Sequence, residues 1–279
     1  MATFDSAHVA EALDFHGRVV VVTGGARGIG REISEGFLSA GADVVVCGRS
    51  EVDDDQLPSV IDRTGGAKRA RYVRADIRKP DQASSVVTTT TEQFGRIDAL
   101  INNAGGSPQA DADAASPRLF ESIVALNLLA PLYCAQAANG VMQTQADGGS
   151  IVNISSVSGL RPSPGTAAYG AAKAGLINLT QTLAVEWAPR VRVNCLSGGL
   201  VATEAADDHY GGAEGMALVA ATVPLGRFGT PDELAGLCLV LASPLAAYVS
   251  GANLVVHGGG EWPAFFTAVE QATGGRSAR

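Results

Sequence analysis

Tyr169 and Lys173 stand four positions apart in the stretch YGAAK, at the start of an apolar run that predicts a helix. Residues with this spacing lie on one face of a helix, so the phenol and the ammonium can point into one cleft. Tyrosine titrates near ~10 and is a poor acid or base at neutral pH. A neighbouring cation lowers that pKa, so the pair can carry general acid–base chemistry. Many exposed helices carry the same spacing by chance. The elements around YGAAK are therefore needed to distinguish a catalytic pair from an exposed helix turn.

A phosphate-binding element lies near the start of the chain. The β-branched run from Arg18 to Gly24 predicts a buried strand, TGGARGIG covers residues 23–30, and an amphipathic run then predicts a helix that ends at Gly41. Glycines let the backbone approach a pyrophosphate, and the helix N-terminus supplies free N–H groups. A tight turn without a ligand is the alternative, but a strand before it and a helix after it are the context of a dinucleotide site.

The residues after the second predicted strand bear on the choice of dinucleotide. The strand covers 43–47 and is followed by Gly48 and Arg49. At this position an acidic side chain binds the ribose hydroxyls, whereas an arginine accommodates a 2′-phosphate. Arg49, together with Arg27 inside the glycine turn, favours NADP(H) over NAD(H). The acidic stretch 51–55 lies just beyond and keeps NAD(H) as the alternative.

Further strand and helix patterns alternate along the chain. The predicted strands lie within 67–77, 99–102, 149–156, 192–199 and 253–256, and the predicted helices at 81–94, 116–145 and 166–187. This alternation predicts an α/β fold: a single Rossmann-type doubly wound domain, with a seven-stranded parallel sheet and helices on both faces. We expect the domain to span 17–260, with a substrate lid at about 204–223. A loosely ordered extension (1–16) precedes it and a tail (261–279) follows it.

Composition argues against several other classes. The net charge of −8 argues against a nucleic-acid-binding protein, because such a protein needs a basic stripe. The four cysteines are far apart, which suggests reduced thiols in the cytoplasm and neither disulfides nor a zinc site. The acidic start predicts no signal peptide. No uncharged run of ~18 residues has bilayer character, so we expect no membrane span.

Together these motifs resemble those of the short-chain dehydrogenase/reductase family, over about residues 17–260. They stand in order as TGGARGIG, Asp76, Asn-Asn-Ala-Gly at 102–105, Asn127, Ser156, Tyr169-x-x-x-Lys173 and Thr203. The family's catalytic serine lies 13 positions before its tyrosine, which selects Ser156. The resemblance implies hydride transfer between NADP(H), or NAD(H), and a secondary alcohol or its ketone. It also implies a homodimer or homotetramer.

The resemblance assigns roles to four residues. Tyr169 would exchange a proton with the substrate oxygen, and Ser156 would polarise that oxygen. Lys173 would lower the pKa of Tyr169 and bind the nicotinamide ribose, and Asn127 would order a water between Lys173 and solvent. Asp76 would bond the adenine. The residues implied in cofactor binding are Gly24, Arg27, Gly28, Ile29, Gly30, Arg49, Asp76, Ile77, Asn103, Ala104, Gly105, Tyr169, Lys173, Gly199, Val201 and Thr203.

The sequence departs from the family pattern at two places. Gly198-Gly199 replaces the usual Pro-Gly, which predicts a looser loop because proline stiffens a turn. His257 stands where the family commonly has aspartate, and we expect it to be structural and far from YGAAK. In the expected lid, Tyr210, Met216 and Leu218 could face an apolar substrate. The aromatic stretch 262–266 is expected to pack on a neighbouring subunit or near the lid.

Two other functions are compatible with the same fold. A catalytically silent dinucleotide-binding sensor or scaffold would not need Ser156, Tyr169 and Lys173 together. A methyltransferase is disfavoured by the glycine spacing and by YGAAK, and an epimerase by the absence of a longer carboxyl-terminal substrate domain.

Overall fold

The carboxyl ends of seven parallel strands lie along one edge of a single sheet, in the order β5-β2-β1-β6-β7-β8-β9. The computed structural model describes residues 6–204, 206 and 210–273 of the chain. The strands of the sheet are β1 (Val19–Thr23), β2 (Asp43–Gly48), β5 (Arg71–Arg74), β6 (Ala99–Asn102), β7 (Gly149–Ser156), β8 (Val191–Gly198) and β9 (Asn253–Val256). The chain adds β2 and then β5 on one side of β1, and it then crosses to the other side of β1 to form β6. The crevice at such a reversal is where ligands bind in open α/β sheets.

Alternate residues of the central strand face two hydrophobic clusters, one on each side of the sheet. Val20 and Val22 belong to the cluster that contains Ile33, whereas Val21 belongs to the cluster that contains Leu183. Successive side chains of a strand point to opposite faces. A strand covered on both faces therefore needs an unbroken apolar run, which is why the β-branched residues of β1 form the centre.

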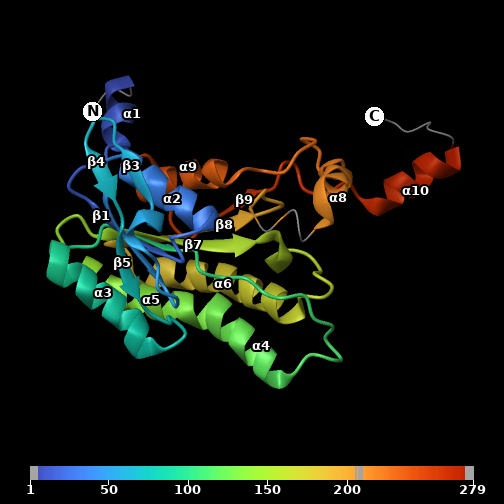
Figure 1. Cartoon of the computed structure of the whole chain (residues 1–279), viewed down its shortest axis with the longest axis horizontal. Coiled ribbons are helices and arrows are strands. Elements are labelled where there is room, and N and C mark those ends of the chain that lie inside the picture. Colours follow the sequence, from blue (N-terminus) through green and yellow to red (C-terminus); the bar gives the residue numbers. More distant parts are fainter. Residues whose placement is uncertain (1–5, 205, 207–209, 274–279) are drawn as a thin grey trace.

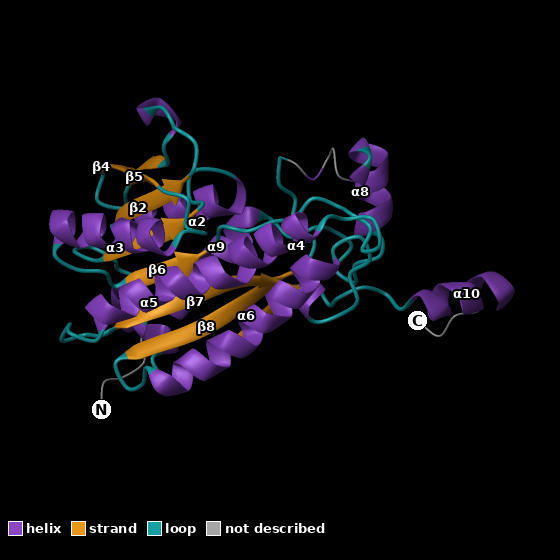
Figure 2. Ribbon diagram, turned by 90° about the horizontal axis from the view of Figure 1, so that it is seen from below, coloured by secondary structure: helices purple, strands orange, loops and turns teal. Residues whose placement is uncertain are grey.

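Helices cover both faces of the sheet (Figure 1). Figure 2 shows the same arrangement of helices and strands from below. On one face α2 packs against α9, and on the other α3 packs against α5 while α6 covers β7 and β8. These helices are α2 (Gly28–Ser39), α3 (Pro80–Phe94), α5 (Ala130–Met142), α6 (Ala167–Glu186) and α9 (Pro231–Ala242). Short 3₁₀ turns lie at η1 (Asp54–Gln56), η3 (Val157–Gly159) and η4 (Pro244–Ala246). The predicted doubly wound α/β fold is confirmed.

The helix predicted over 116–145 is interrupted by a π-helical segment. Helix α4 (Pro117–Val124) leads into η2 (Ala125–Leu129) and then into α5. By length and composition alone, the whole stretch 117–142 is long and apolar enough to cross a membrane, although no such span was expected from the sequence. Its α5 part is a core helix: Cys134, Ala138 and Met142 are buried in the cluster on that face of the sheet.

The segment predicted as one strand within 67–77 is divided in the structure. Only β5 joins the main sheet, while β4 (Ala67–Arg69) pairs antiparallel with β3 (Ser59–Ile61). The Asp62 carboxylate accepts hydrogen bonds from the N–H groups of Thr64 and Gly66, both at 2.9 Å. This side-chain turn closes a hairpin that the strand pattern alone did not predict.

The two ends of the chain differ in how they are held. Helix α1 (Ser6–Ala12) precedes Phe15, which is buried and packs edge-on against Phe37 at 5.0 Å between ring centroids. This part of the expected extension is therefore attached to the domain. At the other end, α8 (Gly212–Ala220) lies in the expected lid, and α10 (Ala264–Thr273) extends away from the body (Figure 1). Residues 1–5, 205, 207–209 and 274–279, His209 among them, lie outside the described residues.

Candidate active site

The glycine-rich turn between β1 and α2 has the close packing that a dinucleotide site requires. A Cβ atom on Gly30 would lie 2.3 Å from the carbonyl oxygen of Gly24, and Gly24 and Gly28 have φ values of 64° and 52°. Glycine is needed at all three positions for these reasons. The Ser34 hydroxyl donates to the carbonyl oxygens of Gly25 and Gly30, at 2.9 and 2.8 Å, and holds the turn. The first N–H groups of α2 are left facing the crevice, where an anion can bind.

Two further predicted residues of this turn lie on either side of the glycines. Arg27 is the exposed N-cap residue of α2, so its guanidinium can reach an anion at the helix end. Ile29 is half-buried against the hydrophobic cluster on that face of the sheet. Its contribution to a bound ligand is therefore mainly its backbone.

Thr23 ties the glycine turn to the loop after β6. Its hydroxyl accepts hydrogen bonds from the N–H groups of Asn103 and Ala104, both at 3.0 Å. The Asn103 side-chain amide donates to the carbonyl oxygens of Thr23 (3.0 Å) and Gly24 (3.3 Å). The two loops form one hydrogen-bonded platform at the point where the strand order reverses. This role of Thr23, the first residue of the glycine motif, was not predicted from the sequence.

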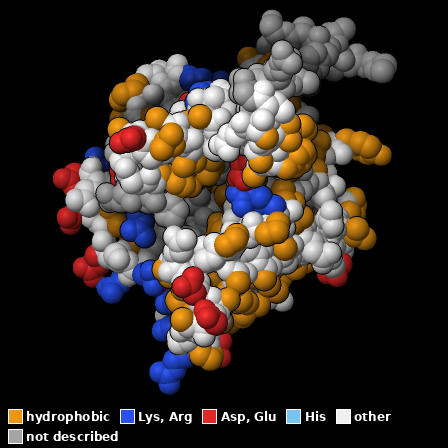
Figure 3. Space-filling view, turned by 90° about the vertical axis from the view of Figure 1, so that its right-hand side faces the viewer, with side chains coloured by type: hydrophobic (Ala, Val, Ile, Leu, Met, Phe, Trp, Pro, Cys, Tyr) orange, Lys and Arg blue, Asp and Glu red, His pale blue; other side chains and the backbone are white. Residues whose placement is uncertain are grey.

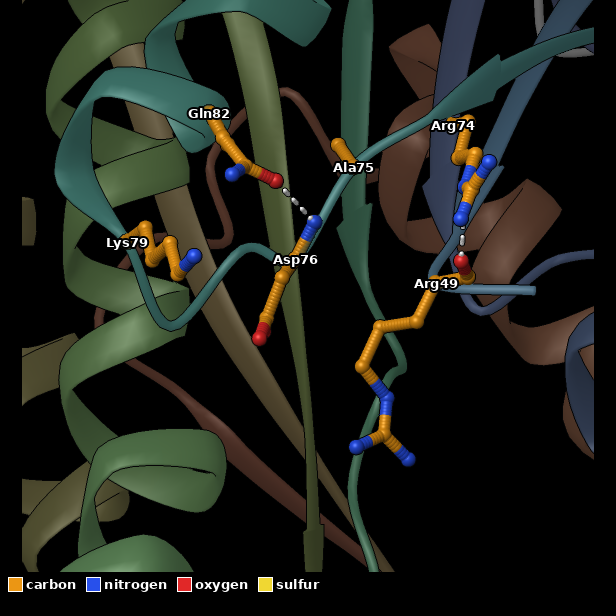
Figure 4. Close-up of a pocket in the computed structure, with 6 residues that line it drawn as sticks. All are labelled: Arg49, Arg74, Ala75, Asp76, Lys79 and Gln82. Atoms are coloured by element: carbon orange, nitrogen blue, oxygen red, sulfur yellow. Dashed lines mark hydrogen bonds between the residues drawn. The ribbon is translucent and has the colours of Figure 1, made fainter.

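A pocket of about 430 Å³ lies beside the ends of β2 and β5. Figure 4 shows its lining, in which Arg49, Arg74 and Lys79 are cationic. Arg74 is paired with Glu51 at 2.7 Å. In the described part of the chain, the Arg49 guanidinium has no hydrogen bond or ion pair. It extends into the same open space as the side chain of Asp76 (Figure 4).

Asp76 and Ile77 lie at this pocket in different ways. Arg78 donates to the Asp76 carboxylate at 2.9 and 2.6 Å, and these hydrogen bonds are the main cause of the lowered pKa of Asp76. The backbone N–H of Asp76 donates to the side-chain oxygen of Gln82 at 2.7 Å. Ile77 is buried in the core, so only its backbone can face a ligand.

Gly48 at the tip of β2 has a steric reason to be glycine. A Cβ atom there would lie 3.0 Å from the hydroxyl oxygen of Tyr72, which itself donates to the carbonyl oxygen of Ser50. Tyr72 thus fills the space beside the strand end. An acidic side chain that binds ribose hydroxyls from this position would press against the Tyr72 hydroxyl.

Ser156 and Tyr169 are brought together because the turn η3 packs directly on α6. A Cβ atom on Gly170 would lie 2.8 Å from the carbonyl oxygen of Ser158, and one on Gly159 would lie 2.7 Å from the backbone of α6. The two glycines let the end of β7 meet the first turn of the helix. Glycine weakens a helix at a position such as Gly170. That Gly170 allows the close packing of η3 on α6 was not predicted from the sequence.

The Ser156 hydroxyl lies close enough to Tyr169 to act on the pKa of its phenol. The Ser156 oxygen also accepts from the N–H of Ser158 at 3.1 Å, so its own hydrogen is free to be donated. Burial raises the pKa of Tyr169, and the hydrogen bond from Ser156 opposes that rise. A protonated phenol with a serine beside it can hold and protonate a carbonyl oxygen.

Lys173 lies behind Tyr169 and is fully buried. Its Nζ is 5.5 Å from the centroid of the Tyr169 ring and donates to the carbonyl oxygen of Ile154 at 2.7 Å. Burial lowers the pKa of Lys173 to about 8. Burial is the largest cause of the raised pKa of Tyr169 in this structure, and the expectation that Lys173 lowers that pKa stays a prediction.

Asn127, Lys173 and Gly105 converge on one point. A Cβ atom on Gly105 would lie 2.8 Å from Asn127 Oδ1 and 3.1 Å from Lys173 Nζ. The Asn127 oxygen accepts from the N–H of Gly106, and its amide donates to the carbonyl oxygens of Gly106 and Ile123, all at 2.9 Å. The side chain therefore positions the loop after β6 within the π-helical turn. Its amide hydrogens are used by backbone carbonyls.

His257, one of the two departures from the family pattern, packs against Gly199, the glycine that the pattern retains. A Cβ atom on Gly199 would lie 2.7 Å from the Cβ of His257, so the histidine packs over a glycine that has no room for a side chain. Ser156 lies opposite Gly198 in β8, and Gly198 lies opposite Val256 in β9. His257 is thus only two strands from Ser156. The expectation that it lies far from YGAAK is wrong.

The residues after β8 continue along this edge. Val201 forms a parallel bridge with Gly229 and packs against the core, and Thr203 is half-buried. Tyr210 packs edge-on against Phe228 at 5.3 Å between ring centroids. Leu218, expected to face a substrate, is 68% exposed.

A second pocket, of about 260 Å³, lies just beyond Ser156 at the ends of β7, β8 and β9. Val157, Gly199 and His257, which follow these strands, line it together with part of the η3–α6 loop. Figure 3 shows this end of the molecule, where hydrophobic side chains gather around a few charged ones. Of the predicted residues, the structure brings Asn127, Ser156, Tyr169 and Lys173 together. It places the others along the same edge of the sheet, from β5 to β8.

The fold and this edge define an α/β protein with a dinucleotide-type cradle beside a cluster of serine, tyrosine and lysine. A family model described as "Enoyl-(Acyl carrier protein) reductase" matches residues 24–261. A 3-oxoacyl-[acyl-carrier-protein] reductase of Synechocystis is 36% identical over 245 residues, 87% of this chain and 96% of the relative. A galactitol 2-dehydrogenase of Agrobacterium fabrum is 33% identical over 252 residues, 87% and 96% of the two chains.

A solved structure of a known protein is also similar to this chain, in both fold and sequence. The short-chain type dehydrogenase/reductase of Mycobacterium marinum has a TM-score of 0.80 and 34% identity, covering 90% of this chain and 98% of its own. The chain belongs to the short-chain dehydrogenase/reductase family. Membership makes it an oxidoreductase that acts on CH–OH or C=O groups, with a nicotinamide-type cofactor.

Proposed function

We propose that this protein transfers a hydride between NADP(H) and a secondary alcohol or its ketone, with Tyr169 as the general acid and base. The observation that carries the proposal is the pair of neighbouring hydroxyls of Ser156 and Tyr169 at the carboxyl edge of the sheet, with Lys173 over the Tyr169 ring. A protein that only bound a dinucleotide would have no need of this pair. The catalytically silent sensor or scaffold is therefore the weaker alternative.

The residues divide the chemistry among them. The bound cofactor supplies or accepts the hydride. Ser156, whose oxygen already accepts from the N–H of Ser158, donates its hydrogen to the substrate oxygen. In the reducing direction Tyr169 gives its proton to that oxygen, and its raised pKa keeps the proton in place until then. Lys173 supplies positive charge behind the ring once the phenol ionises.

The pocket at the ends of β2 and β5 supports NADP(H) over NAD(H). Arg49 has an uncommitted guanidinium there, and planar guanidinium groups suit phosphate. Strand β2 ends in Gly48, so the acidic side chain that would bind the ribose of NAD(H) is missing at this position. Arg27 at the start of α2 adds a second cation on the same side. The NADP(H) pyrophosphate would lie on the glycine turn, with Gly24, Gly28 and Gly30 allowing its approach.

The remaining expectations stay part of this proposal. The substrate is a small carbonyl or alcohol compound, and the protein works in the cytoplasm as a homodimer or homotetramer. The domain spans 17–260, and 204–223 act as the substrate lid. The exposed aromatic side chains of the tail, Trp262, Phe265 and Phe266, favour packing on a neighbouring subunit.

A substrate screen tests the proposed function. Purified protein is incubated with NADPH or NADH and a panel of ketones, sugars and acyl thioesters, and loss of the reduced nicotinamide is followed by absorbance. We expect turnover of at least one ketone, with NADPH preferred. Binding of NADPH without turnover of any carbonyl or alcohol compound in either direction would favour the silent alternative.

A further inference from the structure

The pocket beyond Ser156 has one polar corner in an otherwise apolar wall. Val157, Leu160, Leu200 and Val223 contribute apolar side chains to the lining. Arg161, His257 and Glu261 supply the polar groups. The corner is built from segments far apart in the sequence, because Arg161 follows β7, His257 follows β9 and Glu261 begins the tail. None of these three residues was expected to be part of a site.

The charges in this corner are already balanced. Arg161 and Glu261 form an ion pair, and each side chain is only about two-fifths exposed, at 40% and 38%. Glu261 is held in place because the N–H of the next residue, Trp262, donates to the carbonyl oxygen of Thr222 at 2.9 Å. An anionic substrate group that approached Arg161 would be repelled by the neighbouring Glu261 carboxylate. A purely apolar group would displace water from the ion pair and would not replace the hydrogen bonds that the water makes.

A hydroxyl group fits the pair better than either of these. It donates one hydrogen bond and accepts others, so it can satisfy Glu261 and Arg161 at the same time. Among the described residues, the guanidinium donates to Glu261 and to the carbonyl oxygen of Pro162, so it has further donors for a substrate.

His257 adds a second polar partner. Its ring is half-buried, with Nε2 3.4 Å from the place a Cβ atom on Gly260 would take. No residue in the described ranges, 6–204, 206 and 210–273, hydrogen-bonds to its ring nitrogens. A neutral imidazole offers one donor and one acceptor, the same combination that a hydroxyl group matches.

We propose that Arg161, Glu261 and His257 form a specificity subsite for a hydroxyl group of a small neutral substrate, beyond its reacting carbon. The inference rests on the proposed oxidoreductase function and names the substrate class for it: hydroxylated ketones and polyols, and not keto acids or simple alkyl ketones. The pocket volume of about 260 Å³ lies below the ~300 Å³ at which pockets for drug-sized ligands begin, which agrees with a small substrate.

Three ketones with one carbon skeleton test the subsite. Pentan-2-one, 5-hydroxypentan-2-one and 4-oxopentanoate differ only in carrying a methyl, a hydroxyl or a carboxylate group at the far end. We expect kcat/KM for the hydroxyketone to exceed both others by about tenfold or more, mainly through KM, since a hydrogen bond to a charged group contributes about that much. Calorimetric dissociation constants, measured with the oxidised cofactor bound so that no turnover occurs, should rank in the same order.

Glu261→Gln keeps the size of the side chain and removes the charge that balances Arg161. The variant should gain about tenfold or more for 4-oxopentanoate relative to the hydroxyketone. Glu35→Gln is the matched control, because Glu35 pairs with Arg31 at 2.9 Å on α2, away from this pocket, and it should leave the ranking unchanged. Melting temperatures show that each variant is folded.

The outcomes separate the two proposals. Equal or better use of pentan-2-one or 4-oxopentanoate by the wild type, or an unchanged ranking in Glu261→Gln, overturns the subsite while the oxidoreductase function stands. Turnover of none of the three ketones, together with failure of the broader substrate screen, overturns the proposed function and the subsite with it.

Discussion

The Nζ atom of Lys173 lies 5.5 Å from the centroid of the Tyr169 ring, under the ring and not at the hydroxyl. Its hydrogen bond goes to the carbonyl oxygen of Ile154. Burial acts on both side chains in the direction of the uncharged form, raising the pKa of Tyr169 and lowering that of Lys173 to about 8. The site therefore holds a proton on the tyrosine and holds the lysine close to its ionisation point.

The pKa of Lys173 predicts a pH-dependent stability. The unfolded side chain has its ordinary pKa of 10.5, and the folded one has a pKa of about 8. Between these values the unfolded state binds more protons, so the free energy of unfolding rises with pH from about 8 to about 10.5. Below about pH 8 the lysine is charged in both states and this pH dependence is absent.

Lys173→Met should lack this rise. The measurement is the difference in melting temperature between wild type and variant, without added cofactor, at pH values across that window. The stability of the wild type relative to the variant should increase as the pH rises. A difference that stays constant, or that shrinks with pH, would show that Lys173 is not held in a depressed state.

Gly105→Ala should disturb the point where Asn127 and Lys173 meet. The added Cβ atom would lie 2.8 Å from Asn127 Oδ1 and 3.1 Å from Lys173 Nζ, so one of the two must move. We expect kcat to fall by about tenfold or more, because small misplacements in a site are costly. Gly140→Ala is the control, since a Cβ atom there meets nothing within 4 Å and alanine favours a helix. Equal activity of the two variants would contradict the account.

Arg49→Ala should weaken NADPH selectively. The guanidinium at the pocket beside β2 would lose its contact with the 2′-phosphate, while NADH has no such group. We expect the dissociation constant for NADPH to rise by about tenfold or more and that for NADH to change little. Arg190→Ala, at the opposite end of the sheet, should change neither. A wild type that binds both cofactors equally would refute the preference for NADP(H).

Periodicity predicted most of the fold because the five central strands of the sheet, β1, β2, β6, β7 and β8, are buried on both faces. The central strands read as unbroken apolar runs, and β6, β7 and β9 begin and end as predicted. The hairpin of β3 and β4 was missed because the Asp62 carboxylate creates its turn, a contact with no periodic signature. The π-helical turn at Asn127 was missed for a similar reason, since it changes the backbone spacing without changing the apolar pattern.

The catalytic cluster could be predicted from the spacing of its residues, but the pocket next to it could not. Ser156 and Tyr169 lie on elements whose order fixes where they meet. Arg161, His257 and Glu261 meet only because η3, β9 and the tail fold back to one place. The contact between Gly199 and His257 also joins two residues that are 58 positions apart and have no common pattern in the sequence.

Tyr169→Phe tests the central claim most directly, since it removes one oxygen atom with little change in volume. We expect NADPH to bind as it does to the wild type, while kcat on a substrate established for the wild type falls by about 10²–10⁴-fold. Tyr248→Phe removes the same atom from a fully exposed ring and should leave kcat unchanged. A Tyr169→Phe enzyme that turns over within about twofold of the wild type would contradict the assignment of Tyr169 as the general acid and base.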